Sequence, residues 1–305
     1  MNLVGRTEEW LFGARRANYA VAVIRILFGL GMLAFLLTNL ADRHYLWGDA
    51  ARWQTPIADN GGFGFPFTLF DAGRSPGTLT LLYLALLGLV VIFTLGWQTR
   101  FVTPLVLIAW TSLIESNVVY GDQSDNIVRI LLLYLCFADL SGRWSLDERR
   151  RRRSRAPTLI GTLLHNLAVV AVGAQLCLVY VASAMYKIQG DAWQEGTAIY
   201  YPLQIDVYRP WPALADLLTA NSLVLLAATY FTVFIQLFFP FLLLRRSTRI
   251  FALVGVTAMH LGIAVVMGMP FFSLFILAAD AVFIRDTTFE EVAGRARRRL
   301  VATHR

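Results

Sequence analysis

Charged side chains are scarce in this 305-residue sequence: they make up 15% of it, against 57% hydrophobic residues. With a mean hydropathy of +0.58, the chain has too few charges to cover the surface of a soluble enzyme, and that class is excluded. The net charge of +7 would suggest nucleic acid in a soluble protein, but here its placement matters more than its sum. The composition predicts a membrane protein in contact with the lipid bilayer, with no nucleic acid as partner.

Cysteine and lysine are also rare. Cys136 and Cys177 each lie in an apolar run, which excludes a disulfide-stapled fold and a paired-cysteine redox or zinc site. Lys187 is the only lysine among 27 basic residues, a bias toward arginine that is typical of a GC-rich, bacterial coding sequence. The motifs HExxH and G-x-S-x-G are missing as well, and we expect no metal site.

Long apolar runs dominate what is present. A membrane-spanning helix needs about 20 apolar residues, and eight runs approach that length. They predict an all-α, polytopic integral membrane bundle of about eight transmembrane helices. The range is six to eight, because two runs are short and the turn at 267–270 can be a kink within one long helix. The runs fall at about 18–40, 78–97, 101–118, 126–141, 159–187, 221–244, 249–267 and 270–285.

Basic residues favour one side of the membrane. With the N-terminus in the cytoplasm, most arginines fall in cytoplasmic segments, including a basic loop at 142–157 and the C-terminal tail. We therefore expect both termini in the cytoplasm of a multi-pass protein of the cell's inner (plasma) membrane. The first apolar run lacks the pattern of a cleaved signal peptide and is interpreted as a retained span.

Two long loops lie on the outer side in this topology, at 41–77 and 188–220. Both contain aromatic residues, such as Trp193 and Trp211, that suit the membrane interface. We expect these loops to lie on the bilayer and to roof whatever the bundle encloses. Since no repeat and no long polar stretch is present, residues 1–305 are predicted to form a single transmembrane domain.

Few polar residues lie within the apolar runs, where an ionisable group is costly unless it is paired or hydrated. Lys187 ends the fifth run after small residues at 182–184, which let another helix approach closely and desolvate the amine. A desolvated amine is able to take a proton. An exposed lysine at a helix end is instead an interface anchor. The spacing alone leaves both roles open for Lys187. His260, deep in the seventh run, needs a hydrogen-bond partner or a polar cavity, and Gln236 is expected to bond between helices.

A second polar group begins the fourth run. Asp125 and Arg129 are four residues apart and can pair on one helical face. Together with Asp122 they form either a structural helix start or part of a binding site. In the predicted topology this group falls in the outer half of the bundle. A single outward-opening polar cavity would then contain it together with Lys187 and His260.

Three blocks of the sequence match one known pattern. They are Tyr180–Ala198, Phe137–Asp147, and His260 followed by Val265–Phe272. Together they resemble the HTTM domain, the membrane portion shared with vitamin K-dependent gamma-carboxylases. The resemblance covers nearly the whole chain: the first block is similar to the family's helix end, the second to its Phe-x-Asp…Trp-Ser-x-Asp turn, and the third to its late helix.

The resemblance implies a chemistry. In those carboxylases a lysine of the first block deprotonates vitamin K hydroquinone, in a reaction that ends with carbon dioxide adding to a glutamate. By this resemblance Lys187 is the catalytic base, His260 is its polar partner, and the cofactor is a reduced vitamin K, menaquinol-like, with no metal. We add candidate substrate- or cofactor-binding residues: Asp122, Ser124, Asp125, Arg129, Tyr186, Trp193 and Gln236.

Two departures separate the chain from true carboxylases. Where they carry a functional histidine before the fourth helix, this chain has Ser124 in the sequence Gln-Ser-Asp, and we expect no soluble propeptide-binding domain. Three hypotheses stay open. The chain is a quinol-dependent, carboxylase-like lyase acting on a peptide or small substrate, an SdpB-like maturation or export factor for a secreted peptide or partner protein on the outer side, or a non-catalytic quinone- or lipid-binding membrane protein.

Overall fold

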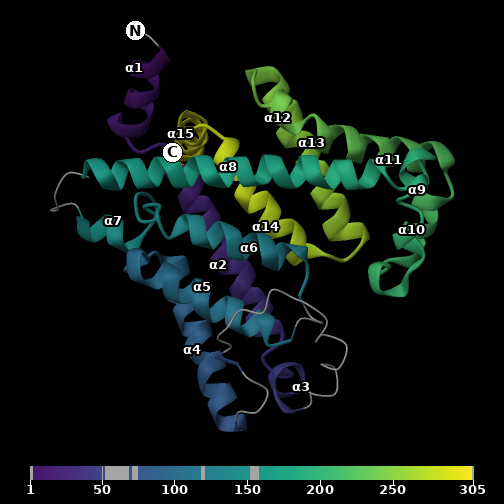
Figure 1. Ribbon diagram of the computed structural model, residues 1–305, viewed down its shortest axis with the longest axis horizontal. Helices are drawn as coiled ribbons and strands as arrows, with labels where there is room; N and C mark the ends of the chain where they lie inside the picture. Colours follow the sequence, from purple (N-terminus) through teal and green to yellow (C-terminus); the bar gives the residue numbers. More distant parts are fainter. Residues whose placement is uncertain are drawn as a thin grey trace. The chain divides into compact units, whose positions relative to one another are not determined.

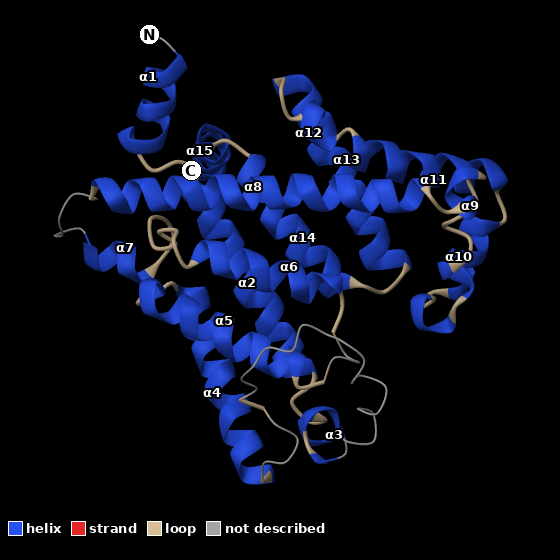
Figure 2. Cartoon of the chain, in the orientation of Figure 1, coloured by secondary structure: helices blue, strands red, loops and turns tan. Residues whose placement is uncertain are grey.

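The computed structural model of the protein describes residues 3–49, 51, 69–70, 75–117, 121–151 and 158–303. These ranges contain helices and turns but no strand, so the predicted all-α class is confirmed for them (Figure 2). Parts of two predicted loops, at 52–68 with 71–74 and at 152–157, lie outside the described residues. The chain divides into two compact units: unit 1 is Met1–Val172 with Ala281–Arg305, and unit 2 is Gly173–Asp280.

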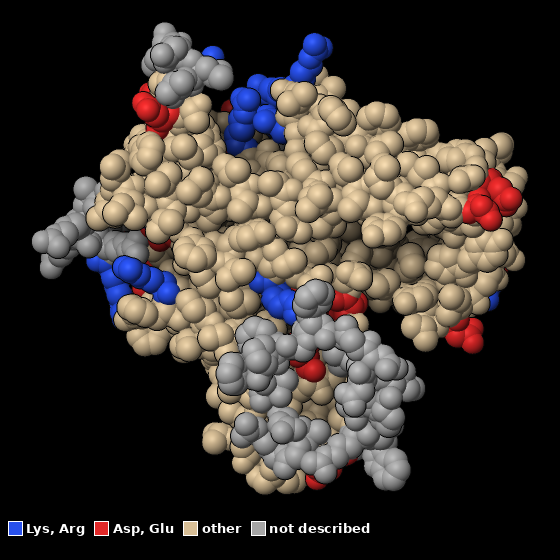
Figure 3. Space-filling view, in the orientation of Figure 1, with Lys and Arg blue, Asp and Glu red and all other residues tan. Residues whose placement is uncertain are grey.

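Each of the eight apolar runs contains a helix, but the helices differ in length (Figure 1). Among the described residues, four helices are long and apolar enough to cross a membrane: α2 (Asn18–Thr38), α4 (Pro76–Leu95), α8 (Leu159–Ile188) and α13 (Arg246–Val266). The number rises to five if α10 (Pro212–Thr219) and α11 (Ser222–Leu237), bent by 93°, form one span. The space-filling view shows uncharged residues over α11 and the middle of α8, as lipid contact requires (Figure 3).

The other helices in the apolar runs are shorter: α5 (Thr99–Glu115), α6 (Gln123–Leu135) and α14 (Pro270–Asp280). A membrane protein is therefore supported, whereas eight spans and cytoplasmic termini stay predictions. Outside the runs lie α1 (Leu3–Glu8), η1 (Glu9–Gly13), α3 (Arg43–Trp47), α7 (Leu146–Arg151), α9 (Asp191–Gln194), η5 (Pro202–Gln204), η6 (Asp206–Tyr208), α12 (Phe239–Leu242), η7 (Ala281–Phe283) and α15 (Asp286–Thr303).

Unit 1 is built on the packing of α2 against α4, of α4 against α5 and of α5 against α6. Large apolar side chains such as Phe28 and Trp110 are fully buried in it. Gly29 allows close approach of α2 to α4, because a Cβ at this position would overlap the Thr94 side chain. The Tyr83 hydroxyl donates a hydrogen bond to a backbone carbonyl of α2 at 2.7 Å, so the contact between the two helices is also fixed by a polar group.

The block Phe137–Asp147 forms a turn that ties α2 and α5 together. Arg25 of α2 is fully buried and donates to the carbonyls of Leu140 and Trp144 at 2.5 and 2.6 Å. Asp147 accepts the first free backbone N–H groups at the start of α5, at 3.0 and 3.2 Å. This block of the family resemblance therefore has a structural role in the described part of the chain.

Unit 2 contains the second half of α8 and the elements from α9 to α14. Helix α13 packs against α11, α12 and α14. Gly255 of α13 makes room for Ile235 of α11, since a Cβ there would lie 2.8 Å from the isoleucine Cδ1. Helix α13 ends at Val266, Gly268 turns the chain at φ +68°, and α14 begins at Pro270. The turn at 267–270 is thus a break between two helices and no mere kink.

Candidate functional site

A cavity of about 520 Å³ lies within unit 2. One stripe of α11 and one stripe of α13 form two of its walls, and α8 contributes its last turns. Trp193, Pro202 and Leu203 also line it, so the segment predicted as the loop at 188–220 contributes to the wall of this cavity. Most lining side chains are aliphatic or aromatic. The polar ones, apart from the Trp193 indole, are Ser183, Lys187, Thr232, Gln236 and His260.

Lys187 lies in the last turn of α8, as predicted, and its amine is held from three sides. Its Nζ donates to Ser183 Oγ at 2.5 Å and to Gln236 Oε1 at 3.0 Å. The same Nζ lies 5.3 Å from the centroid of the Trp193 ring, within range of a cation–π contact. No ion pair in the described part of the chain involves this lysine. An amine in an apolar cavity is therefore positioned by neutral groups alone.

His260 of α13 lines the same cavity and is 3% exposed. Neither of its ring nitrogens has a hydrogen-bond partner among the described residues. Its ring is flanked by Tyr180 and Phe272, with centroids 6.3 and 5.7 Å away. The predicted need for a partner or a cavity is thus met by the cavity. A neutral imidazole in this position offers one donor and one acceptor to a bound molecule.

The remaining predicted site residues divide into two sets. Trp193 and Gln236 line the cavity and contact Lys187. Tyr186, by contrast, is 78% exposed and is not among the lining residues. The residues predicted around the start of the fourth run belong to unit 1 and are not among the residues that line this cavity of unit 2: Asp122, Ser124, Asp125 and Arg129.

The predicted pair of Asp125 with Arg129 is wrong. Asp125 instead accepts the backbone N–H of Asp122 at 2.9 Å, and Asp122 accepts the N–H of Ser124 at 2.6 Å, which together cap α6. Arg129 pairs with Glu115 of α5 at 2.5 Å. Asp125 is occupied by the helix start, and the guanidinium turns to the neighbouring helix. These contacts give Asp122, Asp125 and Arg129 structural partners, and their role in binding stays a prediction.

Two polar residues of unit 2 were not singled out from the sequence. Ser183 counted only as a small residue, yet its hydroxyl contacts Lys187. Asp280 at the end of α14 is 4% exposed and accepts a hydrogen bond from the Tyr180 hydroxyl at 2.7 Å, while its Oδ1 has no partner among the described residues. The signal for Asp280 was available, since it is an acidic residue inside the apolar run 270–285.

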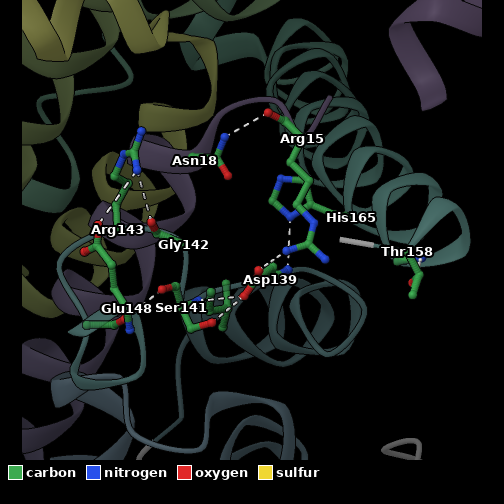
Figure 4. Close-up of polar contacts among 12 residues, drawn as sticks. Arg15, Asn18, Asp139, Ser141, Gly142, Arg143, Glu148, Thr158 and His165 are labelled. Atoms are coloured by element: carbon green, nitrogen blue, oxygen red, sulfur yellow. Dashed lines mark hydrogen bonds and ion pairs between the residues drawn. The ribbon is translucent and has the colours of Figure 1, made fainter. Parts of the chain in front are cut away.

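Unit 1 contains a buried histidine of a different kind, His165 of α8 (Figure 4). Its Nε2 bonds the Arg16 carbonyl at 2.7 Å, and its Nδ1 accepts the backbone N–H of Asp139 at 3.0 Å. The Asp139 carboxylate in turn pairs with Arg15 and accepts the N–H of Ser141 at 3.1 Å. Every nitrogen of this ring is satisfied within the protein, so the cluster is structural. Across the described ranges, no group of three or more His, Cys, Asp or Glu side chains could hold a metal ion.

Comparison with known proteins covers both units. The family model of the HTTM domain matches residues 15–287. A protein of Bacillus subtilis (strain 168) described as "Uncharacterized protein YitO" is 24% identical over 216 residues, which cover 67% of this chain and 67% of that protein. No solved structure matches the chain. The matched range includes the cavity, with Lys187 and His260.

Proposed function

This chain belongs to the HTTM domain family, and from that premise we propose a quinol-dependent, carboxylase-like function in the inner membrane. The family relates the protein to the membrane domain of gamma-carboxylases and to SdpB-like proteins. The observation that carries the proposal is the position of Lys187 Nζ, in an apolar cavity and in contact with neutral oxygens. An amine of this kind suits a base that takes a proton from an acidic hydroxyl.

A reduced, menaquinol-like quinone fits the residues present. The cavity of about 520 Å³ is of the size that small-molecule sites have, and its walls include the aromatic rings of Trp193, Phe231 and Phe272. The two unpaired nitrogens of His260 and the amine of Lys187 are the groups that would meet the oxygens of such a ligand. When bound, a reduced quinone supplies an acidic hydroxyl and reducing electrons.

Lys187, His260 and the apolar lining have different roles in the proposed reaction. Lys187 takes a proton, since its contacts leave a neutral form accessible. His260 donates or accepts a hydrogen bond at a second oxygen and stabilises negative charge that develops there. The apolar lining excludes water, which strengthens both interactions. The substrate that reacts further is a peptide or small molecule arriving from the outer side.

The proposal is tested by protection of Lys187 from an amine-reactive reagent in purified, detergent-solubilised protein. Because the chain has one lysine, peptide mapping by mass spectrometry reports this amine alone. Addition of a reduced menaquinone analogue is expected to slow its labelling by about tenfold at saturation, whereas the dimethyl ether of the same quinol gives little protection. Equal labelling with and without the quinol would overturn the proposal. Lys187→Met is expected to abolish quinol-dependent turnover.

A second function is favoured by the exposed apolar residues of the segment that covers the cavity. Val207, Trp211 and Leu217 are 80%, 59% and 70% exposed, and an SdpB-like maturation or export factor would bind its peptide at such a surface. In that case Trp211→Ala impairs appearance of the secreted peptide more than Lys187→Met does. A non-catalytic quinone- or lipid-binding protein would instead retain ligand binding in Lys187→Met.

A further inference from the structure

The amine of Lys187 is held by contacts from its own helix and from two other elements. Ser183 lies one turn earlier on α8, so its hydrogen bond fixes Nζ only relative to the lysine's own helix. Trp193 of α9 offers the face of a ring and no directed acceptor. Gln236 belongs to α11, and its Oε1 at 3.0 Å is the directed contact that ties Nζ to another wall of the cavity. Among the described contacts, the direction of the amine therefore depends on Gln236.

The chemistry of this contact also matters. Gln236 is 7% exposed, and an amide oxygen accepts a hydrogen bond from either the ammonium or the neutral amine. A carboxylate at the same distance would form an ion pair and hold the lysine in its charged form, because an opposite charge within about 4–6 Å favours that form. An amide at this position gives placement without fixing the charge.

We propose that Gln236 is a positioning residue for Lys187, which aims the amine into the cavity while leaving it free to lose and regain a proton. This inference rests on the proposed role of Lys187 as a base, and it changes the role expected for Gln236 from ligand binding to placement of the amine. Thr232 provides the contrast. It lines the cavity one turn earlier on α11, but its hydroxyl bonds the Ala228 carbonyl at 2.9 Å.

The test is the rate at which Lys187 reacts with an amine-reactive reagent at fixed pH and without ligand, since such reagents attack the neutral amine. Gln236→Glu is expected to slow labelling by about tenfold or more, because its carboxylate stabilises the ammonium. Gln236→Leu is expected to speed labelling at least about twofold, because the ammonium loses an acceptor in an apolar site. The matched control Thr232→Val has nearly the same shape and lies on the same helix. It is expected to leave the rate within about twofold of the parent, because the Thr232 hydroxyl bonds the Ala228 carbonyl and not the amine.

The two variants are expected to change the labelling rate of Lys187 in opposite directions. If Gln236 only supported the packing of the helices, both substitutions would loosen that packing and speed labelling. Equal acceleration in Gln236→Glu and Gln236→Leu, or no change in either, would overturn the inference. If Gln236→Glu does not fold, the pH dependence of labelling is compared in Gln236→Leu and Thr232→Val. A midpoint that moves to lower pH in Gln236→Leu but not in Thr232→Val supports the inference, because loosened packing alone changes the rate without moving the midpoint, and equal midpoints in the two variants overturn it. Protection of the parent by the quinol analogue is scored separately, so a failure there refutes the proposed function and leaves the role of Gln236 standing.

Discussion

The two units each bury a histidine, and the two rings are used in opposite ways. His165 is fully buried and His260 is 3% exposed, so burial does not distinguish them. His165 has both nitrogens bonded to backbone groups, whereas His260 has neither nitrogen bonded within the described residues and faces a cavity. A buried polar group is therefore not by itself evidence of function. What points to function is a buried group whose bonding capacity is left unused beside open space.

Arg25 and Lys187, each in a long apolar helix, extend the comparison. Arg25 donates to two backbone carbonyls that belong to one turn of unit 1, and it joins α2 to that turn. Lys187 has acceptors of its own, but they are side chains on the wall of a cavity, and the amine remains beside the open volume. Unit 1 thus uses these buried polar groups to hold the backbone, while in unit 2 Lys187 and His260 line a cavity.

The largest effect is expected for His165→Phe. The substitution keeps a ring of similar size but removes the imidazole hydrogen bonds to the Arg16 carbonyl and the Asp139 N–H, both partly buried. Each unpaired group costs about 1–3 kcal/mol, so we expect a loss of about 2–4 kcal/mol in the free energy of unfolding. Thermal or denaturant unfolding in detergent measures it. A loss below about 0.5 kcal/mol would mean that the cluster does not hold unit 1 together.

The matched change in unit 2, His260→Phe, is expected to have a much smaller effect on stability. No protein hydrogen bond among the described residues is lost, and two unpaired nitrogens are removed from an apolar site, so we expect a change within about 1 kcal/mol in the stabilising direction. Protection of Lys187 by the quinol analogue is expected to weaken at the same time. If His260→Phe destabilises the protein as much as His165→Phe, then His260 is as important for stability as His165, and the two rings do not differ in role.

The sequence predicted much of the fold because helices in a membrane depend on local length and apolarity. The runs at 18–40 and 159–187 correspond closely to α2 and α8. The count of spans could not be obtained in the same way. In the run 126–141 the helix stops at Leu135, and the residues after it form the turn in which Asp139 meets His165. The end of this helix at Leu135 is set by tertiary contacts of the following turn, and hydropathy does not record such contacts.

The site was partly predictable for a related reason. Lys187 and His260 stand out because ionisable residues are rare in apolar runs, and both line the cavity. The contact of Lys187 with Gln236 joins residues 49 positions apart, and it depends on the register of α8 against α11, which one sequence does not show. For Arg129, spacing along one helix suggested the wrong partner, because Glu115 comes from α5.

The smallest effect is expected for Arg129→Gln, which tests whether the polar group of unit 1 belongs to the site at all. The ion pair of Arg129 with Glu115 is partly exposed, with side chains 31% and 21% accessible, so its loss should cost about 1 kcal/mol or less. Since Arg129 does not line the cavity, neither the labelling rate of Lys187 nor its protection by the quinol analogue should change. A clear fall in protection would show that the two polar groups act on one ligand, as the predicted joint cavity required. Unchanged protection leaves the capping and ion-pair contacts as the reason for these charges at the start of α6.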